Sequence, residues 1–315
     1  MQESPLTPQV HPGPRGLPAP RWSQGSTGLA YAALALPAAL VLAFVAWPSL
    51  STLIHSLLAL NARDEATGFA GLANYRALFA QPLFGHVLAN TAWFTLAAST
   101  LSVLVALALA FLLARVRGDH PMARGLLVAI FSPTIIPTIA AANLWLYFLA
   151  PQIGLVDRLL RWLGLGGENW LGQPHSALAV MVALYLWKYA PYYALFLLAG
   201  MQAVPRNVLD ALRLDDPRGA LGFWRVLLPL LAPMLLFVTV LALLNAVETV
   251  DPIYVMTQGG PNNGTNLVMY YLYQLGFEFF AWGPAAALSA LLMAVLSSLS
   301  ALALIVLERR AFHWQ

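Results

Sequence analysis

The stretch "VPRNVLDALRLDDPRGALGFWRVLLPLLAP" (Val204–Pro233) places seven charged side chains between two long apolar runs, residues 177–202 and 227–249. Each run exceeds the roughly 20 apolar residues that cross a bilayer as a helix. Of the 315 residues, 60% are hydrophobic and only 9% are charged, whereas soluble domains carry about 25% charged residues. A chain of this length cannot bury that much apolar surface away from water. The stretch is therefore predicted to be a polar loop between two membrane-spanning helices.

Six apolar segments are long enough to span, and they define the expected fold. They are residues 29–57, 88–114, 124–149, 177–202, 227–249 and 285–307. Pro133, Pro137 and Pro191 lie inside the third and fourth segments; such prolines free backbone carbonyls, which neighbouring helices must then satisfy. We predict an all-α, polytopic membrane protein with a permease domain over 29–310. The proline-rich residues 1–28 are predicted to form a disordered tail.

The arginines indicate the orientation of the spans, because basic residues accumulate in cytoplasmic loops. With the N-terminus inside, eleven arginines are cytoplasmic: Arg15, Arg21, Arg115, Arg117, Arg124, Arg206, Arg213, Arg218, Arg225, Arg309 and Arg310. Only four are outside: Arg63, Arg76, Arg158 and Arg161. Both termini and the loop 204–226 are thus predicted to be cytoplasmic. The tail 1–28 is predicted to lie on the same side.

Two kinds of outer segment are expected. Residues 257–266, "TQGGPNNGTN", are predicted to form a turn-rich loop. Residues 154–165, "GLVDRLLRWLGL", are predicted to form an amphipathic segment with Asp157, Arg158 and Arg161 towards water. That segment either rests on the outer membrane interface or docks a partner.

The charged stretch itself is predicted to be two helices with a sharp break. Residues 205–215 place Val208, Ala211 and Leu212 on one face, and Asp216-Pro217 provides an N-cap and a first-turn proline for a second helix. Two interpretations remain open. The stretch is either a connector lying on the inner leaflet or a docking element for a cytosolic partner.

The spacing of this stretch resembles the EAA loop of inner-membrane permease subunits of binding-protein-dependent ABC importers. The loop's Glu-Ala-Ala positions hold Asp210, Ala211 and Leu212, and Val226, Leu228 and Pro229 close the pattern. Asp216-Pro217 replaces the family's Gly-Ala, which leaves the bend of the loop and the strength of coupling open. The resemblance implies a coupling helix that sits in a cleft of a cytosolic ATPase, with contacts from Asp210, Ala211, Leu212, Arg213, Asp215 and Asp216.

Three further segments resemble the carbohydrate-uptake branch of this family. They are "LWKYAPYYALFLLAGMQAVP" (186–205), "YVMTQGGP" (254–261) and "GLANYRALF" (71–79). The resemblance covers about 29–310 and implies a multi-pass protein of the bacterial inner membrane, surrounded by lipid. It implies a second permease, two ATPase subunits that use ATP and magnesium, and an extracytoplasmic solute-binding protein. The implied function is import of a sugar or related polyhydroxy solute by alternating access.

Chemical motifs argue against an enzyme. The sequence contains no G-x-x-x-x-G-K-[ST] phosphate loop, no H-E-x-x-H and no G-x-S-x-G. Its six histidines are scattered and it has no cysteine. We therefore expect no catalytic residue, no metal site, no cofactor and no nucleic-acid partner for this chain. ATP hydrolysis is expected in a partner subunit.

Polar residues inside the spans are the candidates for a solute path, because ionisable groups there usually face the bundle interior. In sugar-binding sites, aromatic rings stack on the sugar while polar side chains form hydrogen bonds with its hydroxyls. The candidates are Asn143, Lys188, Tyr189, Tyr192, Asn245 and Glu248. Other interpretations remain open: Lys188 pairs with Glu248 or snorkels, and the tyrosines only pack. An ion- or proton-coupled secondary transporter is the alternative function. The identity of the solute, and whether its main site lies in this subunit or in its partner, stay open.

Overall fold

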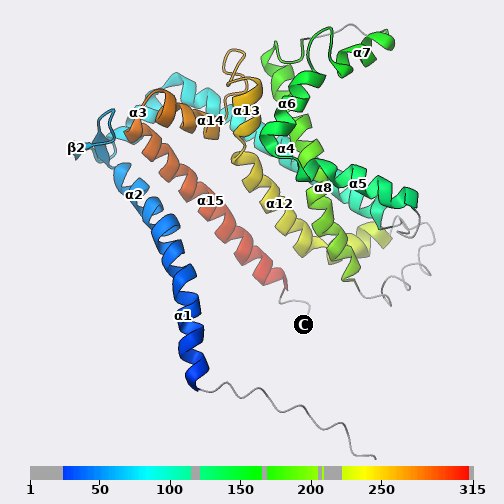
Figure 1. The fold of residues 1–315 in the computed structure, drawn as a ribbon, viewed down its shortest axis with the longest axis horizontal. Coiled ribbons are helices and arrows are strands. Elements are labelled where there is room, and N and C mark those ends of the chain that lie inside the picture. Colours follow the sequence, from blue (N-terminus) through cyan, green and yellow to red (C-terminus); the bar gives the residue numbers. More distant parts are fainter. Residues whose placement is uncertain (1–23, 115–120, 165–168, 205–207, 209–221, 312–315) are drawn as a thin grey trace, which may run out of the picture. The chain divides into compact units, whose positions relative to one another are not determined.

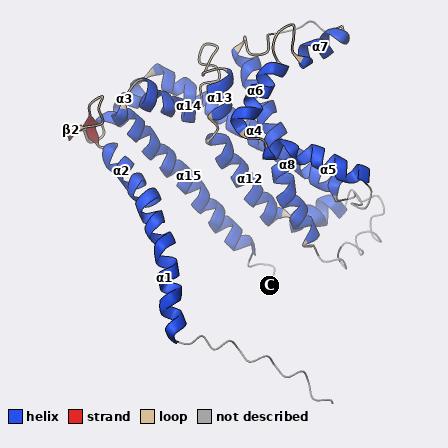
Figure 2. Ribbon diagram, in the orientation of Figure 1, coloured by secondary structure: helices blue, strands red, loops and turns tan. Residues whose placement is uncertain are grey.

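The computed structural model describes residues 24–114, 121–164, 169–204, 208 and 222–311. It divides into two units, one ending at Ser51 and the other beginning at Thr52. Almost every described element is a helix (Figure 2). The loop residues Asp210, Ala211, Leu212, Arg213, Asp215 and Asp216 lie outside the described residues.

The first unit is a helical run. It comprises α1 (Gln24–Val41), the π-helical turn η1 (Leu42–Ala46) and α2 (Trp47–His55), which continues into the second unit. Residues 31–55 have a mean hydropathy of 2.0, and none of their most apolar window is buried. Phe44 and Trp47 are exposed. Such a surface requires lipid or another apolar partner.

The second unit begins with a hairpin, β1 (Leu58–Leu60) paired antiparallel with β2 (Ala66–Phe69). The short helix α3 (Ala73–Ala80) follows. The side chain of Asn74 donates hydrogen bonds to the carbonyls of Ser56 and Leu58 at 2.9 and 2.8 Å. These bonds hold α3 against the chain that enters the hairpin.

Two long helices, α4 (Pro82–Leu113) and α8 (Pro174–Gln202), form the centre of the bundle (Figure 1). Both begin with proline. Proline suits the first position of a helix, because a backbone N–H there would have no partner within the helix. Ala98 and Ala106 are fully buried, as are Leu197 of α8 and Val238 of α12 (Ala232–Val247). Ala98 and Ala106 are small residues, which let membrane helices approach closely.

The third apolar segment is a broken helix. α5 (Pro121–Ile135) and α6 (Thr138–Phe148) meet at an angle of 107°. Pro137 lacks an N–H and restricts the residue before it to extended geometry, so the helix ends at Ile135. Pro133 and Pro191, by contrast, lie within α5 and α8.

The amphipathic segment forms α7 (Leu155–Trp162), but Asp157 does not face water. This carboxylate is 3% exposed, accepts a hydrogen bond from the Gln152 N–H at 2.8 Å and pairs with Arg161 at 2.7 Å. The prediction that Asp157 faces water was wrong, because its carboxylate accepts a hydrogen bond from the turn that leads into α7. Leu159 and Trp162 are exposed.

The C-terminal part completes the bundle. It contains η2 (Phe223–Leu227), α11 (Leu228–Leu230), α12, α13 (Asp251–Met256), α14 (Val268–Tyr273), η3 (Gln274–Glu278) and α15 (Trp282–Ala311). The loop 257–266 is built from turns, with positive φ at Gln258, Asn262 and Asn263, as its composition predicts. Asn90 of α4 donates to the carbonyl of Asn263 at 2.8 Å.

Within the described ranges, five helices are long and apolar enough to cross a membrane, or six when the bent pair α5–α6 is counted as one span. The helical, polytopic fold class is thereby confirmed.

Candidate solute pocket

A cavity of about 140 Å³ lies where α6, α8 and the junction of α12 with α13 meet. It is lined by Thr138, Met181, Leu184, Tyr185, Tyr189, Asn245, Glu248, Thr249, Val250, Asp251 and Pro252. Three of the six residues predicted for a solute path, Tyr189, Asn245 and Glu248, are therefore brought to one place. Their role stays a prediction.

The acidic groups of the cavity are placed by a helix ending. α12 stops at Val247, and α13 begins at Asp251, with Pro252 in its first turn. Glu248 and Asp251 therefore flank a short non-helical link, where carboxylates are not enclosed by helical turns. Among the described lining residues there is no Lys, Arg or His. The cavity thus offers hydrogen-bond acceptors with negative charge.

A chain of hydrogen bonds fixes Asn245. The Tyr185 hydroxyl donates to the carbonyl of Ala242 at 2.8 Å, and a carbonyl only accepts. The bond of 2.8 Å between Tyr193 and Tyr185 must therefore be donated by Tyr193. The Asn245 amide nitrogen donates to Tyr193 at 3.0 Å. This bond engages one N–H of the Asn245 side chain, and among the described contacts its amide oxygen accepts no hydrogen bond, so it can accept one from a solute.

The tyrosines have separate positions. The rings of Tyr185 and Tyr189 lie 4.6 Å apart between centroids, and both line the cavity. Tyr192 lies outside the lining, against Tyr193 at 5.6 Å and edge-on to Phe196 at 5.2 Å. Tyr189 therefore supplies an aromatic wall, whereas Tyr192 packs.

Lys188 and Asn143 are not part of the cavity. Lys188 is 6% exposed and donates to the carbonyl of Ile136, and its Nζ lies 5.8 Å from the centroid of the Tyr189 ring. Within the described chain it makes no ion pair with Glu248. Asn143 donates to the carbonyl of Ile139 at 2.9 Å.

Thr138, Tyr185 and Asp251 line the cavity but were absent from the predicted set. A signal existed for two of them. Tyr185 precedes Tyr189 by four residues and so shares its helix face. Asp251-Pro252 is a helix-start pattern directly after the apolar span. Nothing local marks Thr138, which reaches the cavity only because α6 folds back.

Comparisons with known proteins show which family this chain belongs to. A model described as "Binding-protein-dependent transport system inner membrane component" matches residues 102–313. The sn-glycerol-3-phosphate transport system permease protein UgpA of Brucella abortus is 32% identical over 286 residues, covering 90% of this chain and 96% of the relative. The sulfoquinovosyl glycerol transport system permease protein SmoG of Agrobacterium fabrum is 29% identical over 298 residues, covering 92% and 95%.

A third relative and a solved structure are also similar to this chain. The trehalose/maltose transport system permease protein MalF of Thermococcus litoralis is 32% identical over 240 residues, covering 75% of this chain and 80% of the relative. The fold matches a chain in the crystal structure of a bacterial alginate ABC transporter in complex with alginate pentasaccharide-bound periplasmic protein. The TM-score is 0.78 at 20% identity, over 89% of this chain and 93% of that one.

These matches confirm the resemblance stated from the sequence, and with it a multi-pass protein of the inner membrane. The chain belongs to the family of inner membrane components of binding-protein-dependent transport systems.

Proposed function

We propose that this permease carries a neutral polyhydroxy solute through a path that includes the cavity between α6, α8 and α12–α13. The observation that carries the proposal is the set of acceptors around one aromatic wall: Asn245, Glu248 and Asp251 beside Tyr189. Solute hydroxyls donate to these oxygens while an apolar sugar face covers the ring. This combination of convergent polar groups with an aromatic surface is typical of small-molecule sites.

The solute class is supported by the names of the relatives, which cover glycerol phosphate, sulfoquinovosyl glycerol and trehalose or maltose. All are compounds with several hydroxyl groups. The cavity favours the uncharged members, because two carboxylates line it and its described lining includes no cation. A phosphate would be repelled by Glu248 and Asp251.

The size of the cavity supports a paired assembly. Ligand pockets usually measure about 300–1,000 Å³, whereas this one measures about 140 Å³. A second permease facing this wall would complete the site, and alternating access then opens it to each side in turn. In this assembly an extracytoplasmic binding protein delivers the solute to the outer loops.

Energy comes from two cytosolic ATPase subunits that bind ATP and magnesium and grip the loop 204–226 through Asp210 and its neighbours. The relatives are named as transport system permease proteins, which supports a translocating role for this chain and leaves hydrolysis to the partner. The loop must then be cytoplasmic, as the arginine distribution predicts.

Uptake by the co-purified complex in proteoliposomes tests the proposal. We expect uptake of labelled maltose or trehalose to require internal ATP and the binding protein, and glycerol phosphate to be taken up poorly. Uptake that continues without ATP under a proton gradient would instead establish the secondary-transporter alternative. A preference for glycerol phosphate would contradict the neutral solute class.

A further inference from the structure

A second cavity, of about 280 Å³, shares no lining residue with the solute pocket. It is lined by Thr52, His55, Asp64, Leu272, Gly276, Phe277, Trp282, Ala285, Ala286 and Ser289. One candidate span ends at His55 and another begins at Trp282. Because the ends of two candidate spans line the cavity, we infer that it lies near the lipid headgroups.

The lining is amphiphilic in the manner of a lipid. His55 and Asp64 supply its polar part, and Leu272, Ala285 and Ala286 supply an apolar part. An occupant therefore needs a polar end and a hydrocarbon end.

Two aromatic rings form a corner at this cavity. Phe277 and Trp282 lie 6.1 Å apart between centroids, with their planes at 79°. Two rings at nearly a right angle present faces in different directions. An ammonium group binds an aromatic face within about 6 Å of its centre. The corner therefore favours an organic cation over an anion.

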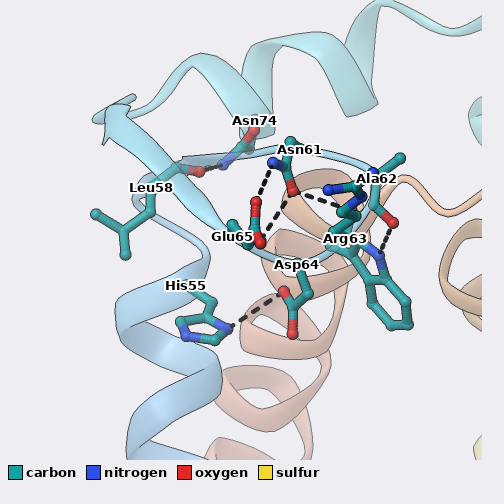
Figure 3. A network of polar contacts seen from close by, with 9 residues as sticks. His55, Leu58, Asn61, Ala62, Arg63, Asp64, Glu65 and Asn74 are labelled. Atoms are coloured by element: carbon teal, nitrogen blue, oxygen red, sulfur yellow. Dashed lines mark hydrogen bonds and ion pairs between the residues drawn. The ribbon is translucent and has the colours of Figure 1, made fainter.

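Asp64 belongs to the hairpin loop (Figure 3) and lines the cavity together with Phe277 and Trp282. The side-chain oxygen of Asn61 accepts from the backbone N–H groups of Arg63 and Glu65, each at 2.9 Å, and the Asp64 N–H donates to the Asn61 carbonyl at 3.0 Å. Trp282 then ties the loop to α15, since its Nε1 donates to the carbonyl of Ala62 at 3.1 Å.

The carboxylate keeps binding capacity. Asp64 is 44% exposed on its side chain, and its contact in Figure 3 is with His55, whose Nδ1 lies 3.8 Å from Oδ1. That separation is longer than a hydrogen bond. Arg63 and Glu65 on the same loop are exposed and opposite in charge, so Asp64 leaves this loop with one net negative charge.

We propose that this cavity binds the headgroup of an ammonium phospholipid, specifically phosphatidylethanolamine. The ammonium sits in the corner of Phe277 and Trp282 and donates to Asp64, a charge-assisted bond of the strong kind. One acyl chain follows Ala285 and Ala286 along α15. An anionic lipid without an amine meets the Asp64 carboxylate and is disfavoured. This proposal does not depend on the identity of the transported solute.

Native mass spectrometry of the full chain, purified with the subunits that accompany it, tests the site. The protein is mixed at pH 8 with equimolar phosphatidylethanolamine, phosphatidylcholine and phosphatidylglycerol. We expect phosphatidylethanolamine to be retained about tenfold over phosphatidylglycerol. Asp64→Asn removes the preference. Glu65→Gln, the same charge change at the next residue but outside the cavity, retains it.

A second variant separates binding from folding. Phe277→Leu keeps an apolar side chain and removes one ring of the corner, so retention of the ethanolamine lipid should fall about fivefold while the melting temperature stays unchanged. Equal retention of all three lipids, or a preference that survives Asp64→Asn, overturns the proposal. Free ethanolamine that binds as tightly as the lipid also overturns it, because the site would then take a soluble amine.

Discussion

Lys188 donates a hydrogen bond to the backbone carbonyl of Ile136, at the residue where the helical segment 124–148 turns by 107°. Pro137 causes the break, and a broken helix leaves carbonyls without intrahelical donors. Inside a membrane there is no water to supply the missing hydrogen-bond donors. The only lysine of the chain therefore supports the helix break, and this relationship explains why it lies outside the solute cavity.

Replacing the donor should weaken the break. Lys188→Met keeps the aliphatic stem but leaves the Ile136 carbonyl unpaired, which should cost about 1–3 kcal/mol of unfolding free energy. The melting temperature of the purified complex measures this loss. Asn143→Ala is the matched control, because Asn143 also donates to a backbone carbonyl of α6, that of Ile139, but from an exposed position. Equal effects of the two variants would contradict the assigned role.

The tyrosine chain makes a separate prediction. Tyr193→Phe removes the acceptor of the Asn245 amide and the donor to Tyr185, so the Asn245 side chain is free to reorient at the cavity. A lost hydrogen bond of about 1 kcal/mol raises the KM for uptake about fivefold.

Maximal uptake should change little, because the cavity keeps its shape. Tyr192→Phe, outside the lining, should leave the KM unaltered. A Tyr193→Phe variant with normal KM and solute preference would show that Asn245 does not need this anchor.

Much of the fold follows from local pattern. Apolar length predicts the spanning helices, Pro82 and Pro174 mark the starts of α4 and α8, and glycine, proline and asparagine predict the turns of 257–266. These properties depend on residues close together in sequence.

The pocket depends on contacts between distant residues, which local pattern does not reveal. Lys188 and Ile136 are 52 residues apart, and Tyr185 is 57 residues from Ala242. Helical periodicity also misplaced Asp157, because its burial results from the turn at Gln152, a residue with a φ of 70°. Sequence thus indicates which polar groups are unusual, whereas packing decides which of them meet.

Glu248 is expected to act directly on the solute. Glu248→Ala removes an acceptor from the cavity lining and should reduce uptake at subsaturating solute about tenfold, the equivalent of one charged hydrogen bond. Initial rates of labelled solute uptake in proteoliposomes give the measurement. Glu308→Ala, which removes an exposed acid near the end of α15, serves as the control. An unchanged affinity and rate for Glu248→Ala would remove this residue from the path.

The predicted coupling loop is tested by reversing one charge. Asp210 holds the glutamate position of the family pattern, and a carboxylate there is expected to contact the ATPase. Asp210→Lys should abolish the stimulation of ATP hydrolysis by solute-loaded binding protein, or prevent the ATPase from co-purifying. Asp210→Glu restores the family residue and should keep at least normal stimulation, because the charge is retained and the side chain is only one methylene longer. If the lysine variant still hydrolyses ATP in response to the loaded binding protein, Asp210 is not a coupling contact, and the charged stretch 204–226 is better explained as a connector on the inner leaflet.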